Sequence, residues 1–296
     1  MKLLLLGGNG QVGRELRRSL APLGELVTAT RDGGNADAVA DFNAPESLAA
    51  LITRIAPDVV VNAAAYTAVD KAETDEEWAV RSNGEAPAVI ARACAASGAL
   101  LVHYSTDYVF DGSASRPYRE DDTTSPLGIY GASKLAGEDA IRASGARYAI
   151  LRTAWVYAAH GKNFLLTMLR LAGEREELRV VADQVGAPTP ASWIADATAA
   201  VISHGVDQSG TWHLTAGGET SWHGFAEAII DEAHALGLIE RKPRVVAIPT
   251  SDYPTPAQRP AYSVLDTTRL RRDFSIVPPE WREGLQRTLD ELAASR

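Results

Sequence analysis

Two residues whose types and spacing could do acid–base chemistry lie in the run Tyr130-Gly131-Ala132-Ser133-Lys134. Residues four apart on a helix share one face, so the phenol of Tyr130 and the ammonium of Lys134 can meet. A positive charge beside a tyrosine favours the phenolate and lowers its pKa. The pair therefore predicts a proton donor or acceptor that serves the oxidation or reduction of a carbonyl.

A glycine loop near the start of the chain predicts the partner for that chemistry. Gly7, Gly10 and Gly13 follow the apolar run 3–6, which predicts a strand, and precede a helical pattern. Glycines let the backbone turn tightly and approach a pyrophosphate, whose charge the helix N-terminus stabilises. Gln11 and Val12 open that helix. A glycine turn without a ligand is the alternative, and the strand–loop–helix context favours a nicotinamide dinucleotide.

The end of the second predicted strand, Thr30-Arg31-Asp32, bears on the coenzyme. An acidic residue there binds the ribose hydroxyls of NAD, and an arginine accepts the 2′-phosphate of NADP. Arg31 favours NADPH, whereas Asp32 leaves NADH open, and a solvated loop arginine is the other interpretation. Asp41 and Phe42 could flank the adenine or form a capping turn.

Small and hydroxylated residues follow two further predicted strands. The segment 62–67 places Ala64, Ala65 and Thr67 where a cofactor could lie flat against the backbone, or where a helix could pack closely. Thr106 and Asp107 follow the apolar run 100–104. A hydroxyl at such an edge can bond a substrate carbonyl as charge develops on its oxygen, although a strand-end turn would use the same residues.

Three residues of the second half complete the candidate substrate site. Trp155 follows a predicted strand and could stack on a sugar or base, or simply pack between lobes. Asn163 precedes a helical pattern and is a predicted N-cap whose helix could also receive a phosphate. Arg259 stands in a proline-rich loop and could bind a diphosphate in a bidentate manner, or lie free on the surface.

Apolar strands alternate with helical patterns through the first half, which predicts an α/β fold with a doubly wound parallel sheet of the Rossmann type. Proline-rich segments in the second half indicate a smaller C-terminal α/β substrate domain. We expect a dinucleotide-binding domain over 1–155 and a substrate domain over 156–296, and the chain can cross back between them. A long helical region ending at Gly98 is expected to bury Trp78 and Val80.

Composition narrows the function classes. The net charge of −9 argues against a nucleic-acid or membrane-surface partner, since both need a basic face. Cys94, the single cysteine, lies in an apolar stretch and is expected to be a buried helix thiol. No apolar run reaches the length of a membrane span, so a cytoplasmic location is expected. No spacing predicts a metal site, and acidic runs such as 73–77 are interpreted as solvated faces.

Several longer stretches carry a resemblance to a known family. They are GGNGQVG (7–13), NAAAYTAVD (62–70), STDYVF (105–110), YGASKLAGE (130–138), RTAWVY (152–157), DQVGAPT (183–189) and RPAYSVLD (259–266). The chain resembles the extended short-chain dehydrogenase/reductases. Within them it is similar to the reductases that convert dTDP-4-dehydro-L-rhamnose to dTDP-L-rhamnose with NAD(P)H, a precursor of cell-surface polysaccharide.

The resemblance implies roles for individual residues. Tyr130 would protonate the C4 oxygen, Lys134 would hold the nicotinamide ribose, and Thr106 would bond the reacting oxygen. Asp107 and Trp155 would contact the sugar nucleotide. The pyrophosphate and the rest of the cofactor groove would be formed by Gly10, Gln11, Val12, Asp41, Phe42, Ala64, Ala65 and Thr67. Some members are thought to dimerise through carboxylate-bound magnesium. The stretch 190–193 offers no carboxylate, which leaves magnesium in doubt and both a monomer and a homodimer open.

Two other functions stay open at this stage. The regulatory subunit of methionine adenosyltransferase resembles the same family and serves as a binding partner, whereas an intact Thr106, Tyr130 and Lys134 fits chemistry better. A nucleotide-sugar epimerase or dehydratase is the second. Dehydratases of this superfamily place acids beside the hydroxyl residue, and here Asp107 is a single acid without an adjacent glutamate.

Overall fold

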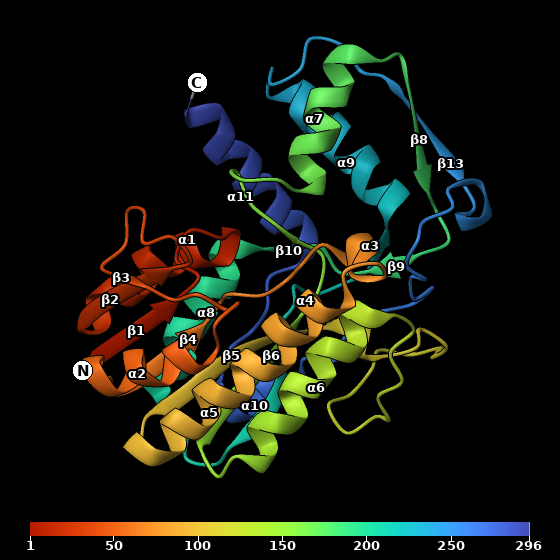
Figure 1. The fold of residues 1–296 in the computed structure, drawn as a ribbon. Coiled ribbons are helices and arrows are strands. Elements are labelled where there is room, and N and C mark those ends of the chain that lie inside the picture. The colour runs from red at the N-terminus through yellow and green to blue at the C-terminus, as the bar shows by residue number, and fades with distance from the viewer. Residues whose placement is uncertain (296) are drawn as a thin grey trace.

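Seven strands form one parallel sheet in the order β11-β6-β5-β4-β1-β2-β3 (Figure 1). The computed structural model describes residues 1–295. The strands of this sheet are β1 (Lys2–Leu6), β2 (Glu25–Thr30), β3 (Ala38–Val39), β4 (Val59–Asn62), β5 (Leu100–Thr106), β6 (Arg147–Thr153) and β11 (Gly210–His213). The order reverses between β1 and β4, and open α/β sheets bind ligands outside the carboxyl ends of the strands at such a switch point.

The alternation of side chains along β1 explains why both faces of the sheet are covered. Leu3 and Leu5 enter one buried cluster, whereas Leu4 and Leu6 enter another on the opposite face. Helices α1 (Gln11–Leu20), α8 (Ala191–His204) and α10 (Thr268–Phe274) contribute to the first cluster. Helices α2 (Glu46–Ile55), α5 (Ala86–Ser97) and α6 (Ile129–Ala143) contribute to the second. The predicted doubly wound parallel sheet is confirmed.

A separate buried cluster lies in the second half of the chain, and the elements that form it stand in the upper part of Figure 1. Its elements are α7 (Phe164–Glu174), α9 (Trp222–Ala235), α11 (Trp281–Ala294) and the parallel pair β8 (Glu177–Val181) with β13 (Arg244–Ile248). Two short ladders complete this half, β7 (Val156–Tyr157) with β10 (Thr189–Pro190) and β9 (Val185–Gly186) with β12 (Thr220–Ser221). Strand β11 and helices α8 and α10 return to the central sheet. The division at residue 155 stays a prediction.

The segment after β4 differs from the single long helix that was expected. It consists of α3 (Val69–Ala72), α4 (Glu76–Val80), one π-helical turn η2 (Arg81–Glu85) and then α5. Trp78 and Val80 are 39% and 36% exposed, so the prediction that they are buried is wrong. The π-helical turn breaks the helical register, and the apolar stripe therefore does not continue across it.

Three short 3₁₀ turns complete the element order: η1 (Ala21–Leu23), η3 (Asp107–Val109) and η4 (Thr250–Asp252). Cys94 is fully buried in α5, as predicted, and burial raises the pKa of its thiol to about 12. Over residues 1–295, the helices are all too short or too polar to cross a membrane.

Candidate active site

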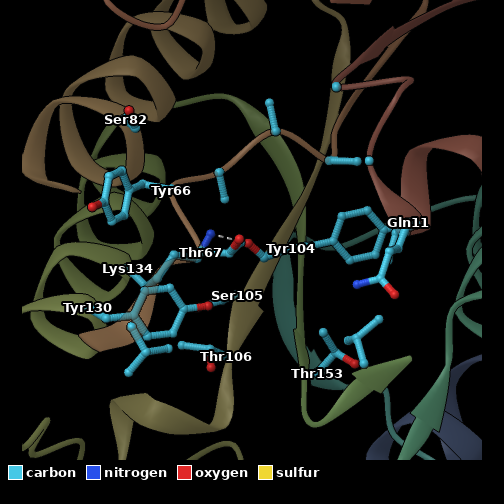
Figure 2. A pocket seen from close by; sticks show the side chains of 18 of the residues that line it. Gln11, Tyr66, Thr67, Ser82, Tyr104, Ser105, Thr106, Tyr130, Lys134 and Thr153 are labelled. Carbon is cyan, nitrogen blue, oxygen red and sulfur yellow. Dashed lines mark hydrogen bonds between the residues drawn. The ribbon is translucent and has the colours of Figure 1, made fainter. Parts of the chain in front are cut away.

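One cavity of about 890 Å³ lies at the carboxyl edge of the central sheet. Its walls come from the ends of β1, β4, β5 and β6, from helix α6, and from Trp222 at the start of α9. Figure 2 shows the side chains that gather there, with Tyr130, Thr106 and Lys134 on one side and Gln11 on the other. The volume is in the range of ordinary ligand pockets, at the upper end.

Two positions of the glycine loop require glycine for the fold itself, whereas a third leaves its backbone open to a ligand. Gly7 has a φ of +83°, and a Cβ on Gly13 would lie 2.0 Å from the Gly7 carbonyl oxygen. These two positions therefore require glycine for the chain to turn and for α1 to pack. A Cβ on Gly10 would lie 3.5 Å from that same oxygen, an ordinary contact. Gly10 lines the cavity and caps α1, so its bare backbone is left for a ligand to approach.

The loop after β2 presents an arginine to the same cavity. Arg31 lines it, whereas Thr30 is buried. The Asp32 carboxylate accepts hydrogen bonds from the Gly34 amide at 3.2 Å and the Thr30 hydroxyl at 3.3 Å, and these bonds lower its pKa. The acid is thus engaged with its own loop, and the basic group is the one at the cavity.

Phe42 lines the cavity and Asp41 does not. The Asp41 carboxylate accepts a hydrogen bond from the Asn43 amide at 2.9 Å, which is the capping turn that was the alternative interpretation.

Helix α6, which carries Tyr130 and Lys134, is fixed at its start by residues from the segment after β4. The Ile129 amide donates to Glu73 Oε1 at 2.9 Å, so the interpretation of Glu73 as part of a solvated face is wrong. Asn83, in the π-helical turn, donates to the Ser133 hydroxyl at 3.1 Å and accepts from the Tyr66 amide at 2.9 Å. The π-helical turn η2 therefore places the side-chain amide of Asn83 between helix α6 and Tyr66 of the cavity wall.

Farther along α6, a buried ion pair ties the helix to the sheet. Glu138 accepts from Arg152 Nε at 2.9 Å and Nη2 at 2.7 Å, and both side chains are almost fully buried. The Arg152 guanidinium also lies over the Phe110 ring. Removing one partner of such a pair leaves an uncompensated buried charge, so the pair holds α6 to β6.

The environment of Tyr130 holds its proton more tightly than the sequence indicated. Burial raises the pKa of the phenol above its usual value, and the hydroxyl of Thr106 offsets this only in part. The predicted lowering of the Tyr130 pKa is therefore wrong for the protein alone. Lys134 does not reverse the direction, because its Nζ donates to the Tyr104 carbonyl at 2.6 Å, a bond drawn dashed in Figure 2. Tyr130 is neutral at working pH, which is the form that a proton donor requires.

Lys134 is almost fully buried, and burial lowers the pKa of its ammonium to about 8. The negative charge of Glu138, one turn further along α6, opposes that shift. An ammonium with a pKa of about 8 can supply positive charge beside the cavity, and it can also lose its proton within the ordinary pH range.

The position of Asp107 disfavours the charged form of its carboxyl group. It is 1% exposed, and burial raises the pKa of its carboxyl to about 6. The Thr106 hydroxyl donates to Asp107 Oδ1 at 3.0 Å and accepts from the Tyr108 amide at 3.2 Å. Thr106 and Asp107 thus lie in one short network at the end of β5, directly on the cavity wall.

Trp155 forms an aromatic wall together with a residue that the sequence did not reveal. Its φ of +47° is a strained value for a bulky side chain. The indole stacks on Trp222, with ring centroids 3.5 Å apart and an interplanar angle of 4°. A Cβ on Gly186 would lie 2.5 Å from the same indole, so that glycine leaves the room for it. Strain that persists at a cavity wall points to a functional constraint.

Arg259 lines the cavity and is held there by two neighbouring side chains. Its guanidinium donates to the Tyr108 hydroxyl at 3.0 Å and to Asp70 Oδ2 at 2.8 Å. Tyr108 and Asp107 line the same cavity.

Asn163 does not line the cavity. It caps α7, as predicted, by accepting from the Leu166 amide at 3.0 Å. Its Nδ2 donates to Gln11 Oε1 at 2.8 Å, so the residue joins the start of α1 to the start of α7.

The structure brings most of the predicted site residues together. Those at the cavity are Gly7, Gly10, Gln11, Val12, Arg31, Phe42, Ala64, Ala65, Thr67, Thr106, Asp107, Tyr130, Lys134, Trp155 and Arg259. Gly13, Asp41 and Asn163 lie outside its lining. Residues that the sequence reasoning missed include Tyr66, Lys71, Trp78, Tyr108, Lys162 and Trp222. Tyr108 stands inside a quoted motif and could have been named, whereas Trp222 and Lys162 carry no local signal.

The residues present fit a dinucleotide. The cavity is lined by the uncovered backbone at Gly10, the start of α1, the small residues Ala64 and Ala65, and Arg31. A lysine and a tyrosine four apart, Lys134 and Tyr130, line the same cavity. Within residues 1–295, no group of three histidine, cysteine or acidic side chains could hold a metal ion.

The fold and the site together define a nicotinamide-dependent oxidoreductase of the extended short-chain dehydrogenase/reductase class. The family described as RmlD substrate binding domain matches residues 1–294, and the chain belongs to that family. A dTDP-4-dehydrorhamnose reductase of Burkholderia thailandensis is 53% identical over 291 residues, which cover 95% of this chain and 96% of the relative. The Escherichia coli K12 protein of the same name is 47% identical over 99% of this chain and 98% of the relative.

Solved structures agree with this placement. A dTDP-4-dehydrorhamnose reductase from Clostridium acetobutylicum is 37% identical, with a TM-score of 0.90 over 99% of both chains. The same enzyme from Bacillus anthracis, solved in complex with NADP, is 34% identical, with a TM-score of 0.89 over 98% of this chain and 99% of that one. A UDP-glucose 4-epimerase from Thermus thermophilus, 19% identical with a TM-score of 0.82 over the full length of both chains, shares the fold.

Proposed function

We propose that this protein reduces dTDP-4-dehydro-L-rhamnose to dTDP-L-rhamnose with NADPH, in the synthesis of a cell-surface polysaccharide precursor. The observation that carries the proposal is the cavity itself. A neutral Tyr130 and a Lys134 of lowered pKa line it together with the glycine loop and Arg31, which supports a hydride-transfer site. The high identity to reductases of this name, across nearly the whole of both chains, supports the substrate assignment.

Each side chain has a part in the proposed reaction. The bound cofactor supplies a hydride to C4 of the sugar. Tyr130 gives its proton to the C4 oxygen. The Thr106 hydroxyl, which donates to Asp107 in the protein alone, would turn its one O–H to the same oxygen as negative charge develops there. The Lys134 ammonium holds a ribose hydroxyl of the cofactor and stabilises the phenolate that forms on Tyr130.

The sugar nucleotide is assigned to the side of the cavity that the second half of the chain closes. Arg259 offers a bidentate donor to the diphosphate. Asp107 accepts a hydrogen bond from a sugar hydroxyl, and Trp155 with Trp222 presents an apolar wall to the sugar ring. The division into a dinucleotide-binding domain over 1–155 and a substrate domain over 156–296 belongs to the same proposal.

NADPH is proposed over NADH from the loop after β2. Arg31 is the charged side chain of this loop that lines the cavity, whereas the Asp32 carboxylate is engaged by Gly34 and Thr30. A guanidinium favours the 2′-phosphate, and Asp32 is not among the residues that line the cavity.

The experiment that tests the function measures oxidation of NADPH, and of NADH in parallel, by the purified protein with dTDP-4-dehydro-L-rhamnose. The product is identified by NMR as the L-rhamnose configuration at C4. We expect turnover with both coenzymes and a higher kcat/KM with NADPH. Cofactor binding without any turnover of this substrate would contradict the proposed activity, and a higher kcat/KM with NADH would contradict the coenzyme preference alone.

A further inference from the structure

His103 is a buried histidine that touches the catalytic lysine and has no part in the reaction as proposed above. It lies in the middle of β5, is 1% exposed, and is paired in register with Asn62 of β4. Its Nδ1 lies 3.0 Å from Asn62 Nδ2, and its Nε2 lies 3.4 Å from Lys134 Nζ. The ring therefore bridges the sheet and helix α6 beneath the cavity.

The hydrogen-bond network assigns the tautomer of this ring. Asn62 Oδ1 accepts from the Ala64 amide at 3.2 Å, so the Asn62 amide turns its NH₂ group toward His103. His103 Nδ1 must then accept, because a donor faces it. Burial and the charge of Lys134 hold the pKa of His103 well below its usual value, so the ring is neutral. A neutral ring that accepts at Nδ1 carries its proton on Nε2, which faces Lys134.

This tautomer has a consequence for Lys134. The Tyr104 carbonyl already takes one proton of Nζ at 2.6 Å. An ammonium has only donors, so it gains nothing from an imidazole N–H, whereas the amine form has a lone pair that can accept that N–H. The geometry thus favours the amine. Two other titratable groups act on this end of α6: Glu138 favours the ammonium, and Tyr130 keeps its proton by burial.

We propose that His103 is a positioning residue for the reductase: its Nε2–H, fixed by Asn62, favours the amine form of Lys134 and sets the pH at which the active ammonium is lost. The inference rests on the proposed function, in which the ammonium stabilises the phenolate of Tyr130. Activity then declines as the pH rises through the titration of Lys134. A histidine in the other tautomer would accept from the ammonium and move that decline to higher pH.

The pH profile of kcat/KM, which reports the titration of the free enzyme, tests the proposal with His103→Gln. The glutamine carbonyl can accept from the ammonium, so the basic limb, expected near pH 8 in the wild type, should move up by about one pH unit. The matched control is His213→Gln, which changes a fully buried histidine of β11 that lies outside the cavity lining. We expect no movement of the limb there. A purely structural role would lower kcat/KM of His103→Gln equally at every pH, and that result would overturn the proposal.

A second measurement needs neither a folded variant nor turnover. In wild-type protein labelled with ¹⁵N-histidine, the ring nitrogens of His103 report its tautomer directly. We expect the neutral Nε2–H form throughout the range from about pH 6 to pH 9, because burial keeps the ring uncharged. The Nδ1–H form, or an imidazolium, would overturn the proposal whatever the enzyme's substrate. Absent turnover with the expected tautomer would count against the proposed function instead.

Discussion

Burial governs the chemistry of individual residues in this cavity. It raises the pKa of Tyr130 and Asp107 and lowers the pKa of Lys134, in each case against the charged form. The phenol therefore keeps the proton that the proposed reaction requires, and the pKa of the Lys134 ammonium falls to about 8. Shifts of this kind in opposite directions within one cavity are typical of acid–base sites.

Burial of the Asp107 carboxylate should lower the free energy of unfolding. Its carboxyl pKa rises from 3.8 to about 6 on folding, so the folded state binds the proton more tightly than the unfolded chain does. Stability is therefore lost as the pH rises from about 4 to about 6, and the full cost is present above that range. Asp107→Asn should raise the free energy of unfolding at pH 8 by on the order of 1–3 kcal/mol, with little gain at pH 4, while kcat/KM falls.

Denaturant unfolding of both proteins at the two pH values, beside the activity assay, measures this. A variant that is no more stable at pH 8 than the wild type would contradict the cost assigned to Asp107.

Arg31 should discriminate between the coenzymes. Loss of a charge-assisted contact to the 2′-phosphate costs roughly 1.5–3 kcal/mol, so Arg31→Ala should lower kcat/KM for NADPH by about tenfold or more. The value for NADH should change little, because that coenzyme lacks the phosphate. Arg54→Ala, an exposed arginine of α2 outside the cavity, is the control. Equal losses with both coenzymes would show that Arg31 does not read the phosphate.

At the scale of elements, short segments between strands and helices place the reactive groups. The glycine loop joins β1 to α1, the π-helical turn η2 places Asn83 against α6, and Glu73 caps the start of that helix. None of these segments is long, and each fixes backbone that the cavity uses. The rigidity of the site therefore depends on these short junctions.

Two glycines of one loop should respond differently to alanine. A Cβ on Gly13 would lie 2.0 Å from a backbone oxygen, so Gly13→Ala should destabilise the fold by several kcal/mol or prevent folding. A Cβ on Gly10 would make an ordinary contact at 3.5 Å, so Gly10→Ala should fold with near wild-type stability. It should nevertheless bind NADPH at least tenfold more weakly, because the methyl group occupies the approach to the pyrophosphate.

Thermal unfolding and cofactor titration of the two variants separate these outcomes. Wild-type affinity in Gly10→Ala would contradict the position assigned to the pyrophosphate.

At the scale of the whole molecule, the two halves of the chain meet at the cavity. Lys162 and Trp222 reach its wall from the second half, and Gln11 bonds to Asn163 across the gap between α1 and α7. His160 adds a second link, since its Nε2 lies 2.8 Å from Glu15 Oε1 of α1. The cofactor loop is therefore tied to the half that is proposed to hold the substrate.

Asn163→Ala should show how much that tie contributes. The variant loses both the cap of α7 and the bond to Gln11, so its stability should fall by about 1–2 kcal/mol. KM for NADPH should also rise, because Gln11 lines the cavity and is proposed to contact the cofactor. Gln11→Ala is the matched variant, which removes the link and keeps the cap. If Gln11→Ala binds the cofactor like the wild type, the link between the halves has no role in cofactor binding.

The sequence predicted what local pattern determines. Alternating apolar segments and the glycine loop were enough for the sheet, and motif spacing was enough to bring Tyr130, Lys134 and Thr106 to one cavity. Prediction from the sequence failed where contacts between distant segments determine the burial or the pKa of a residue. The burial of Tyr130 reversed the expected pKa direction, and Trp78 lies at the cavity wall, where it is 39% exposed. Trp222 joins the wall from a distant helix, which no local pattern indicates.

We propose that Tyr130 supplies the proton for the reduction of dTDP-4-dehydro-L-rhamnose. The most direct measurement is single-turnover reduction of this substrate by NADPH in Tyr130→Phe and in wild-type protein, with NADPH affinity determined for both. We predict that the variant binds NADPH with similar affinity and reduces the substrate at least a hundredfold more slowly, since a positioned general acid contributes about that much or more. Reduction by Tyr130→Phe at the wild-type rate would contradict the account.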